Sequence, residues 1–241
     1  MSSIILHQFP NPRYIPNLSP FCMKLECFLR MAKIKYEKTG KVDVSRHAPL
    51  GKVPFIDIDG KQIYDSGLII DHLQQNGHNI DAELSDLQRA DALALRRLLE
   101  EHLYWGIVYS RWVDPAGWPT WKNLLFSKMS FPLKNVAPKV ALRSVNKQLI
   151  GQGLGRHTIE DIYKLTIADL NAVATKLGSH DFYFGTNAYS IDAAICATVG
   201  AILFTPWNFP LKEALKQHQN LLDHYARMIS TYFPEYPSTA K

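Results

Sequence analysis

One short segment, Ser19-Pro20-Phe21-Cys22, constrains the fold more than any other part of the chain, because it carries the signals of a helix start. Ser19 belongs to the residue types preferred as an N-cap, and proline is favoured at the first helical position. Apolar side chains then recur at the spacing of one helix face, at Phe21, Leu25, Phe28, Leu29 and Ala32. The segment therefore predicts an amphipathic helix over residues 19–33.

The segments around this helix predict a small mixed sheet. A buried strand is expected before it at residues 4–9 and a second strand after it at residues 34–38, which makes the two strands a parallel pair. Further along we expect an irregular stretch at 42–52, a strand at 55–58, a hairpin turn at Asp59-Gly60, a strand at 62–64 and a helix at 67–76 capped by Asp65-Ser66. This order of elements is that of a thioredoxin-like domain.

The composition changes after His78, and helical patterns dominate from Ser85 onward. We expect one long helix at 87–113, an aromatic and proline-rich loop around 115–121, and helices at 138–150, 157–177, 190–204 and 211–233. The uncharged stretch at 193–211 is interrupted by prolines, which favours a buried helix ending near Thr205 over a membrane span. The sequence thus predicts a thioredoxin-like domain at 1–78, a linker at 79–84 and an all-helical domain at 85–241.

The bulk properties of the chain exclude several classes of protein. The 241 residues are 46% hydrophobic and 20% charged, which suits a folded protein with a sizeable core rather than a disordered one. The net charge of +5 comes from scattered basic residues without a consecutive run, so we expect attraction for small anions rather than a nucleic-acid partner. The start of the chain lacks the basic region and the apolar run of a signal peptide, and we expect a cytoplasmic protein.

The three cysteines, Cys22, Cys27 and Cys196, indicate a protein without a disulfide framework. Their spacing matches neither a CxxC pair nor a zinc site, so no metal is expected. Cys27 and Cys196 lie in predicted helices and are interpreted as packing residues.

Ser19 stands where a thioredoxin-like disulfide enzyme carries its attacking cysteine, which favours activation of a bound thiol over disulfide exchange. A hydroxyl there can donate a hydrogen bond to the sulfur of bound glutathione, and the positive end of the helix adds a smaller effect of the same sign. The alternative is that Ser19 only caps the helix. Cys22, in the first helical turn, is the rival catalytic residue, and it is either a reactive thiol or a small packing residue.

Two further segments fit a glutathione site. In a thioredoxin-like fold the Val53-Pro54 bond is expected to be cis, which turns the backbone of Val53 outward to pair with a peptide ligand. A trans proline at the start of a strand is the common alternative. Asp65 suits the ammonium group of the γ-glutamyl residue, and the helix start at Ser66 suits its carboxylate.

A cation is also expected near this site. Lys52 stands just before Val53 and suits the glycyl carboxylate of glutathione. Arg46 and His47 are rivals for the same role, and each of the three can instead be an ordinary solvated side chain.

Aromatic residues gather in the second predicted domain. Trp105, Tyr109 and Trp112 recur at i, i+4 and i+7 and so share one helix face. A hydrophobic substrate pocket is expected to be walled by Tyr104, Trp105, Tyr109, Trp112 and Trp118. Ordinary core packing is the alternative interpretation of each of these residues.

Five segments together resemble the glutathione S-transferase superfamily, and in particular its failed-axon-connections and metaxin-like branch. They read SPFCMKLECFLRMAKIKYE, GKVPFIDIDGKQIYDSGLIIDHL, EEHLYWGIVYSRW, GQGLGRHTIEDIY and SIDAAICA. The resemblance covers essentially the whole chain. It implies the glutathione transferase fold, with an α/β thioredoxin-like N-terminal domain and an all-α C-terminal domain. It also implies glutathione as co-substrate, a homodimer and a role in detoxification.

The same resemblance implies roles for individual residues. Ser19 matches the catalytic serine of plant tau-type transferases. The positions that hold glutathione across the superfamily match Lys52, Val53, Asp65 and Ser66. At one point the sequence departs from the wider family, because no tyrosine stands near the end of the first strand, and the nearest one is Tyr14 in the following loop.

Three functions follow from these features. The leading hypothesis is a glutathione transferase in which Ser19 activates the thiol for attack on a small hydrophobic electrophile. The first alternative is a non-catalytic interaction module that keeps the fold. The second is a thiol-disulfide or peroxide reductase that acts through Cys22, which the absence of a CxxC pair disfavours.

Overall fold

The computed structural model describes residues 4–39 and 48–238 of the chain. The chain forms two compact units that are interleaved in sequence. The first unit spans residues 1–94, 177–204 and 220–241, and the second spans residues 95–176 and 205–219. The predicted domain limits follow chain order, whereas each of these units draws on segments that are distant in sequence.

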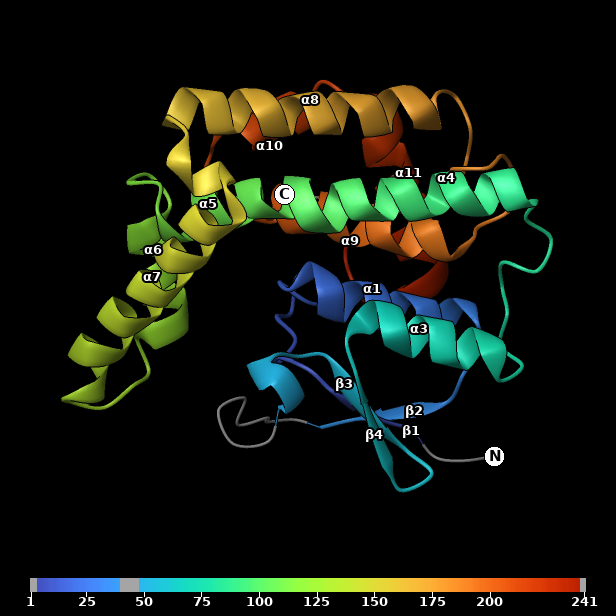
Figure 1. The fold of residues 1–241 in the computed structure, drawn as a ribbon, viewed down its shortest axis with the longest axis horizontal. Helices are drawn as coiled ribbons and strands as arrows, with labels where there is room; N and C mark the ends of the chain where they lie inside the picture. Colours follow the sequence, from blue (N-terminus) through green and yellow to red (C-terminus); the bar gives the residue numbers. More distant parts are fainter. Residues whose placement is uncertain (1–3, 40–47, 239–241) are drawn as a thin grey trace. The chain divides into compact units, whose positions relative to one another are not determined.

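The first unit contains a four-stranded sheet (Figure 1). Its strands are β1 (Ile4–His7), β2 (Tyr36–Lys38), β3 (Phe55–Ile58) and β4 (Lys61–Tyr64), in the spatial order β2-β1-β3-β4. β1 and β2 pair in parallel, whereas β3 is antiparallel to both β1 and β4. The predicted parallel pair and hairpin are therefore confirmed, with positive φ angles at Asp59 and Gly60 in the turn.

Two helices cover one face of this sheet: α1 (Pro20–Met31) and α3 (Ser66–Gln75) (Figure 1). The apolar side chains of the strands and of both helices form one core, which consists of Ile4, Leu6, Leu25, Phe28, Leu29, Ile56, Ile69, Ile70 and Leu73. The helical periodicity that starts at Ser19 thus points into the sheet, as the sequence predicts.

The C-terminal segments of the first unit supply α9 (Ser190–Leu203) and α11 (Gln219–Tyr232). α9 packs along α1. The approach is close because Gly200 has no side chain: a Cβ there would lie 2.9 Å from the Tyr225 ring and 3.3 Å from Met23 Sδ. Every residue of α9 after Ser190 is buried, which confirms the predicted buried helix. In the described parts of the chain, no helix is long and apolar enough to cross a membrane.

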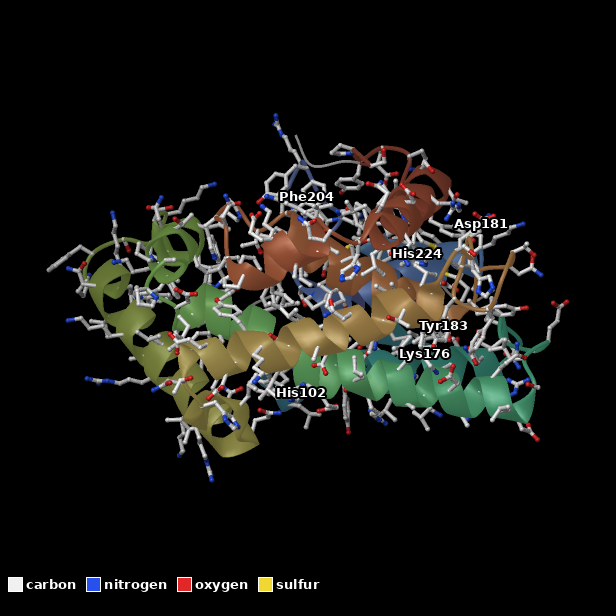
Figure 2. The ribbon with its side chains drawn as sticks, turned by 90° about the horizontal axis from the view of Figure 1, so that it is seen from above. His102, Lys176, Asp181, Tyr183, Phe204 and His224 are labelled. Atoms are coloured by element: carbon white, nitrogen blue, oxygen red, sulfur yellow. The ribbon has the colours of Figure 1, made fainter. Side chains whose placement is uncertain are left out.

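Two buried carboxylates fix the start of α9. Asp192 Oδ1 accepts a hydrogen bond from the backbone N–H of Tyr183 at 2.8 Å and lies 2.9 Å from His224 Nε2 (Tyr183 and His224 are labelled in Figure 2). Asp81, in the predicted linker, binds Ser190 through the backbone N–H at 2.8 Å and through the hydroxyl at 2.5 Å. The linker and the loop before α9 are therefore anchored to the same helix start.

A third buried carboxylate, Glu26 in α1, joins several parts of the first unit. Its side chain is fully buried. It accepts hydrogen bonds from Gln8 at 2.6 Å and from Arg30 at 3.1 Å. Tyr36 and Lys38, both on β2, donate to it at 3.0 Å each. Because a buried charge is costly unless it is paired and hydrogen-bonded, these donors account for the carboxylate in the core.

Arg30 extends this network to the C-terminal end of α11. Its guanidinium donates to the backbone oxygen of Tyr232 at 2.8 Å and to the carboxylate of Glu235 at 2.6 Å. The guanidinium also lies over the Phe233 ring, 4.2 Å from the ring centre. One side chain of α1 thus contacts residues about two hundred positions away in the sequence.

The second unit is helical. α4 (Asp86–Arg97) begins in the first unit and ends in the second. The further helices of the second unit are a π-helical segment (Leu98–Leu103), α5 (Tyr104–Trp112), α6 (Trp118–Phe126), α7 (Leu133–Gln152), α8 (Ile159–Leu177) and α10 (Pro210–Leu215). α4, the π-helical segment and α5 follow one another without a break, so the predicted long helix at 87–113 is confirmed.

Two predicted boundaries in this region are wrong. The expected loop around 115–121 becomes α6 at Trp118, because Pro119 lies in the first helical turn, where its missing N–H removes no helical hydrogen bond. The helix expected at 211–233 is two helices, α10 and α11. The N–H groups of Gln217 and His218 bond to carbonyls only three residues back, and this tight turn ends α10.

Loss of the Glu26 carboxylate is expected to destabilise the protein. Replacement by leucine removes the Glu26 acceptor from Lys38 and Tyr36, leaves Gln8 with only its longer bond to Asn11 and leaves Arg30 with fewer acceptors. Breaking a buried ion pair on one side costs about 3 kcal/mol or more. Urea unfolding of Glu26→Leu should show this loss, whereas Glu37→Ala, at an exposed site on β2, should change the free energy of unfolding by less than about 0.5 kcal/mol. Equal stability of the two variants would contradict the assignment.

Candidate functional site

Three segments that are distant in sequence meet at one edge of the sheet. The register pairs His7, the last residue of β1, with Phe55, the first residue of β3, and pairs Phe55 with Tyr64, the last residue of β4. The Val53-Pro54 segment precedes β3 at this edge, and α3 starts there directly after β4. The start of α1 lies there too, because Cys22 in its first turn packs against Val53 and Phe55.

Ser19 is the N-cap of α1, in an extended backbone conformation, and its Oγ accepts a hydrogen bond from the backbone N–H of Cys22 at 3.4 Å. A serine hydroxyl has both an acceptor oxygen and a donor hydrogen. Capping uses only the acceptor, and the O–H of Ser19 is directed to a sulfur, since this hydroxyl also hydrogen-bonds the Cys22 thiol. Donation to the sulfur of a ligand would replace that contact. Since Ser19 is partly exposed, capping and thiol activation are compatible.

Asn17 holds Ser19 in place, and the sequence reasoning missed it. Its side chain is buried, accepts the N–H of Ser19 at 3.0 Å and donates to the backbone oxygen of Phe9 at 3.0 Å. An asparagine two residues before a helix cap is a common turn signal, and that signal was available in the sequence.

Cys22 is fully buried, and this burial raises the pKa of its thiol to about 11, although the Ser19 hydroxyl acts in the opposite direction. Only the thiolate is nucleophilic, so this cysteine is a poor nucleophile near neutral pH. The structure therefore supports Cys22 as the packing residue and disfavours the reductase.

The Val53–Pro54 peptide bond is cis. Both residues are buried, while the neighbouring Lys52 is exposed. Across the described residues, the backbone N–H and C=O of Val53 take part in no hydrogen bond, so both remain available to an extended peptide ligand. The rival cations Arg46 and His47 lie outside the described residues.

Asp65 and Ser66 form the start of α3. Asp65 is the N-cap, and one of its carboxylate oxygens accepts the N–H groups of Gly67 at 2.8 Å and Leu68 at 3.2 Å. Its φ angle is 68°, which is unfavourable for a residue other than glycine by about 1–3 kcal/mol. Such backbone outliers cluster at ligand sites. Asp65 is exposed and Ser66 is buried, so a carboxylate lies at the rim of this helix end.

The residues of the predicted hydrophobic pocket lie in the second unit and are half-buried. Trp112 stacks on Trp118, with ring centres 5.6 Å apart, and also contacts Trp121 edge-on. Tyr104 and Trp105 form a separate edge-to-face pair at 5.6 Å. The structure thus gathers two of the five predicted residues into one aromatic cluster and leaves the others in separate contacts.

Tyr109, the remaining residue of that set, lies beside a buried pair that the sequence reasoning missed. Its ring packs edge-on against Tyr163 at 6.0 Å, and the Tyr163 hydroxyl donates to the buried carboxylate of Asp114. Burial and the charges of Asp114 and Glu160 raise the pKa of Tyr109, so its hydroxyl stays protonated at neutral pH. No local sequence pattern links these positions, which are about fifty residues apart.

The sequence matches known proteins over most of its length. A family model of the glutathione S-transferase N-terminal domain matches residues 20–117, and a model of the corresponding C-terminal domain matches residues 166–228. The isoprene-epoxide–glutathione S-transferase of Rhodococcus sp. (strain AD45) is 34% identical over 229 residues, covering 90% of this chain and 94% of that protein. The chain belongs to the glutathione S-transferase family.

Two more relatives define the branch and the fold of this transferase-family chain. The Drosophila melanogaster protein failed axon connections is 28% identical over 97% of the chain, and the match covers 59% of that protein's length. A glutathione S-transferase of Methylobacillus flagellatus, solved with glutathione bound, superposes with a TM-score of 0.61 at 15% identity, over 97% of this chain and 99% of the other. The predicted fold and family are confirmed. Within the described residues, no cluster of three metal-binding side chains occurs.

The state of Cys22 can be tested with a thiol reagent. With its pKa near 11, the thiolate fraction at pH 8 is roughly a hundredfold below that of free cysteine. We therefore expect iodoacetamide to modify Cys22 at least about a hundredfold more slowly than free cysteine in the folded protein, and at an ordinary rate in urea. Peptide mass spectrometry measures both rates. Fast modification of Cys22 in the folded protein would contradict this expectation and support the hypothesis of a reductase that acts through Cys22.

Proposed function

We propose that the protein is a glutathione transferase that binds glutathione at the start of α1 and α3 and conjugates it to a small hydrophobic electrophile. The observation that carries the proposal is the meeting of three segments at one edge of the sheet. The register of His7, Phe55 and Tyr64 brings the Val53-Pro54 segment and the start of α3 there, and the packing of Cys22 against Val53 and Phe55 brings the start of α1. No single one of these segments would suffice, since helix caps and X–Pro bonds are common.

The energetics of thiol activation are sufficient for this role. A free thiol with a pKa near 8.5 is only about 3% ionised at pH 7. A hydrogen bond from Ser19 to the charged sulfur is worth roughly 1.5–3 kcal/mol, which lowers the thiol pKa by about 1–2 units. The helix end of α1 acts in the same direction.

The rest of the tripeptide finds complementary groups at the same edge. Asp65 already accepts the N–H groups of Gly67 and Leu68, so the start of α3 offers the backbone N–H and the hydroxyl of Ser66, together with the helix dipole, to the γ-glutamyl carboxylate. The exposed Asp65 carboxylate suits the ammonium group. The backbone of Val53 pairs with the extended peptide, and Lys52 meets the glycyl carboxylate.

The substrate class follows from the relative that acts on an isoprene epoxide. We infer a small apolar epoxide as the electrophile. The glutathione thiolate attacks a ring carbon, so that a C–S bond forms while the C–O bond breaks. The resulting alkoxide takes a proton from water. The half-buried aromatic side chains of α5 and α6 suit the apolar part of such a substrate.

The role of Ser19 can be separated from its capping with two substitutions. Glycine is tolerated as an N-cap at a cost of a few tenths of a kcal/mol but removes the hydroxyl, whereas threonine keeps it. We expect Ser19→Gly to bind glutathione nearly as tightly as the native protein. The pKa of the bound thiol should rise by about 1–2 units in this variant, and conjugation of isoprene epoxide at neutral pH should slow by about 10–100-fold. Calorimetry gives the affinity, and ultraviolet titration of the thiolate gives the pKa.

Ser19→Thr serves as the matched control and should retain most of the conjugation rate. Conjugation by Ser19→Gly at the native rate would refute the role of Ser19 alone. A native protein that binds no glutathione at millimolar concentration would overturn the whole proposal and leave the non-catalytic interaction module.

The pairing of Asp65 with the ammonium group can be tested with a modified ligand. The native protein should bind glutathione about tenfold more tightly than an analogue that lacks the γ-glutamyl ammonium, because a charged hydrogen bond is lost with the analogue. Asp65→Ala should bind both ligands with equal affinity. Asp86→Ala, which removes an exposed carboxylate from the start of α4, should keep the native difference. A preference for glutathione that persists in Asp65→Ala would contradict the assignment.

A further inference from the structure

The helical hairpin formed by α6 and α7 concentrates the positive charge of the protein. Between Asp114 and Glu160 the sequence has seven basic and no acidic residues: Lys122, Lys128, Lys134, Lys139, Arg143, Lys147 and Arg156. Because the net charge of the whole chain is +5, the remaining residues together carry −2. Basic residues occur along the whole sequence, but the excess of positive over negative charge is concentrated in this region.

The cations of the hairpin are exposed and are not neutralised by neighbours. All six of those on α6, α7 and the turn between them are exposed. Among the residues that the structure describes, none of the six lies within ion-pair distance of a carboxylate. Exposed like charges of this kind attract an anionic surface.

Large apolar side chains are exposed on the same hairpin. Phe131, in the turn, is 83% exposed, the highest value of any large apolar residue described. The other exposed apolar residues of this region are Leu124, Leu125, Met129, Leu133, Val136 and Val140. They come from the end of α6, from the turn and from the first half of α7, two helices that lie side by side (Figure 1). An apolar patch of this kind marks an interaction site.

Apolar and basic residues share one face of α7. Leu133, Val136 and Val140 recur at i, i+3 and i+7, and Arg143 and Lys147 continue that face toward the end of the helix. The face is thus apolar near the turn and basic further along. Lysine and arginine extend their charged ends past such an apolar region to the level of lipid headgroups.

We propose that the α6–α7 turn docks on the surface of an anionic lipid bilayer, with Phe131 and its apolar neighbours in the interfacial layer and the lysines against the headgroups. A second copy of the chain does not fit, because it would bring the same unpaired cations together. An acidic protein groove is less suitable, because the exposed apolar residues belong to two helices and their turn rather than to one helix face.

Vesicle binding by the full chain tests the proposal. We expect cosedimentation with phosphatidylcholine vesicles that contain phosphatidylserine, and at least about tenfold weaker binding to vesicles of phosphatidylcholine alone. Binding should weaken at high salt, since exposed charges are screened. This readout is independent of glutathione, so its outcome and that of the transferase assay are separate.

Two substitutions and two matched controls assign the binding to the hairpin. Phe131→Ser should weaken vesicle binding by about tenfold or more, since it removes the largest apolar contact. Lys128→Glu combined with Lys134→Glu should remove the preference for anionic lipid. Leu87→Ser, at a site that is 81% exposed on α4, and Lys61→Glu, on β4, should bind like the native protein.

A fluorescent label provides the depth of insertion. The three native cysteines are buried, so a cysteine introduced by Met129→Cys can be labelled selectively. A nitrobenzoxadiazole label there should shift to the blue on anionic vesicles, whereas a label at Leu87→Cys should not. Absence of vesicle binding, equal binding to both kinds of vesicle, or binding unaffected by Phe131→Ser overturns the proposal. Capture of polyglutamate without vesicle binding overturns it in favour of an acidic protein partner.

Discussion

The hydrogen bonds of the buried Glu26 carboxylate hold α1 in place, and the proposed glutathione site depends on that helix. Donors from β2 and from the loop after β1 bind Glu26, and Arg30, one turn further on the same face of α1, connects that face to the end of α11. A catalytic group must be held within a fraction of an ångström of its productive position. For the role proposed for Ser19, this positioning is provided by the helix that it caps, which is anchored through Glu26 and Arg30, and by Asn17, which binds the N–H of Ser19.

The site uses helix ends in place of charged side chains. In the proposed complex the start of α1 would face the sulfur and the start of α3 a carboxylate, so that each helix offers its partial positive charge to an anionic part of one ligand. Asp65 is the exception, because it presents a negative charge and holds an unfavourable φ angle. Its carboxylate accepts two N–H groups of α3, which offsets the cost of that backbone conformation.

The sequence predicts the sheet and the starts of α1 and α3 better than it predicts the polar interior that supports them. The sheet and its two helices follow from apolar periodicity and from turn residues, which are local signals. The partners of Glu26 and Arg30 are spread over more than two hundred residues, and no local pattern links them. The turn that separates α10 from α11 lacks glycine and proline, so the sequence offers no break signal there. The start of α6 does not follow from the sequence either, because Pro119 is equally compatible with a loop and with the first turn of a helix.

The net charge is divided unevenly between the two units, and this affects the attraction that the first unit has for an anionic ligand such as glutathione. The first unit, which holds the glutathione residues, has 13 basic and 15 acidic residues and so carries −2, whereas the second has 14 and 7 and carries +7. The first unit by itself therefore has no excess of positive charge to attract an anionic ligand. Exposed charges act over about one Debye length, roughly 8 Å at physiological salt. For the proposed glutathione site, the described groups of the first unit that can attract an anion at such short range are the two helix starts, the N–H of Val53 and Lys52.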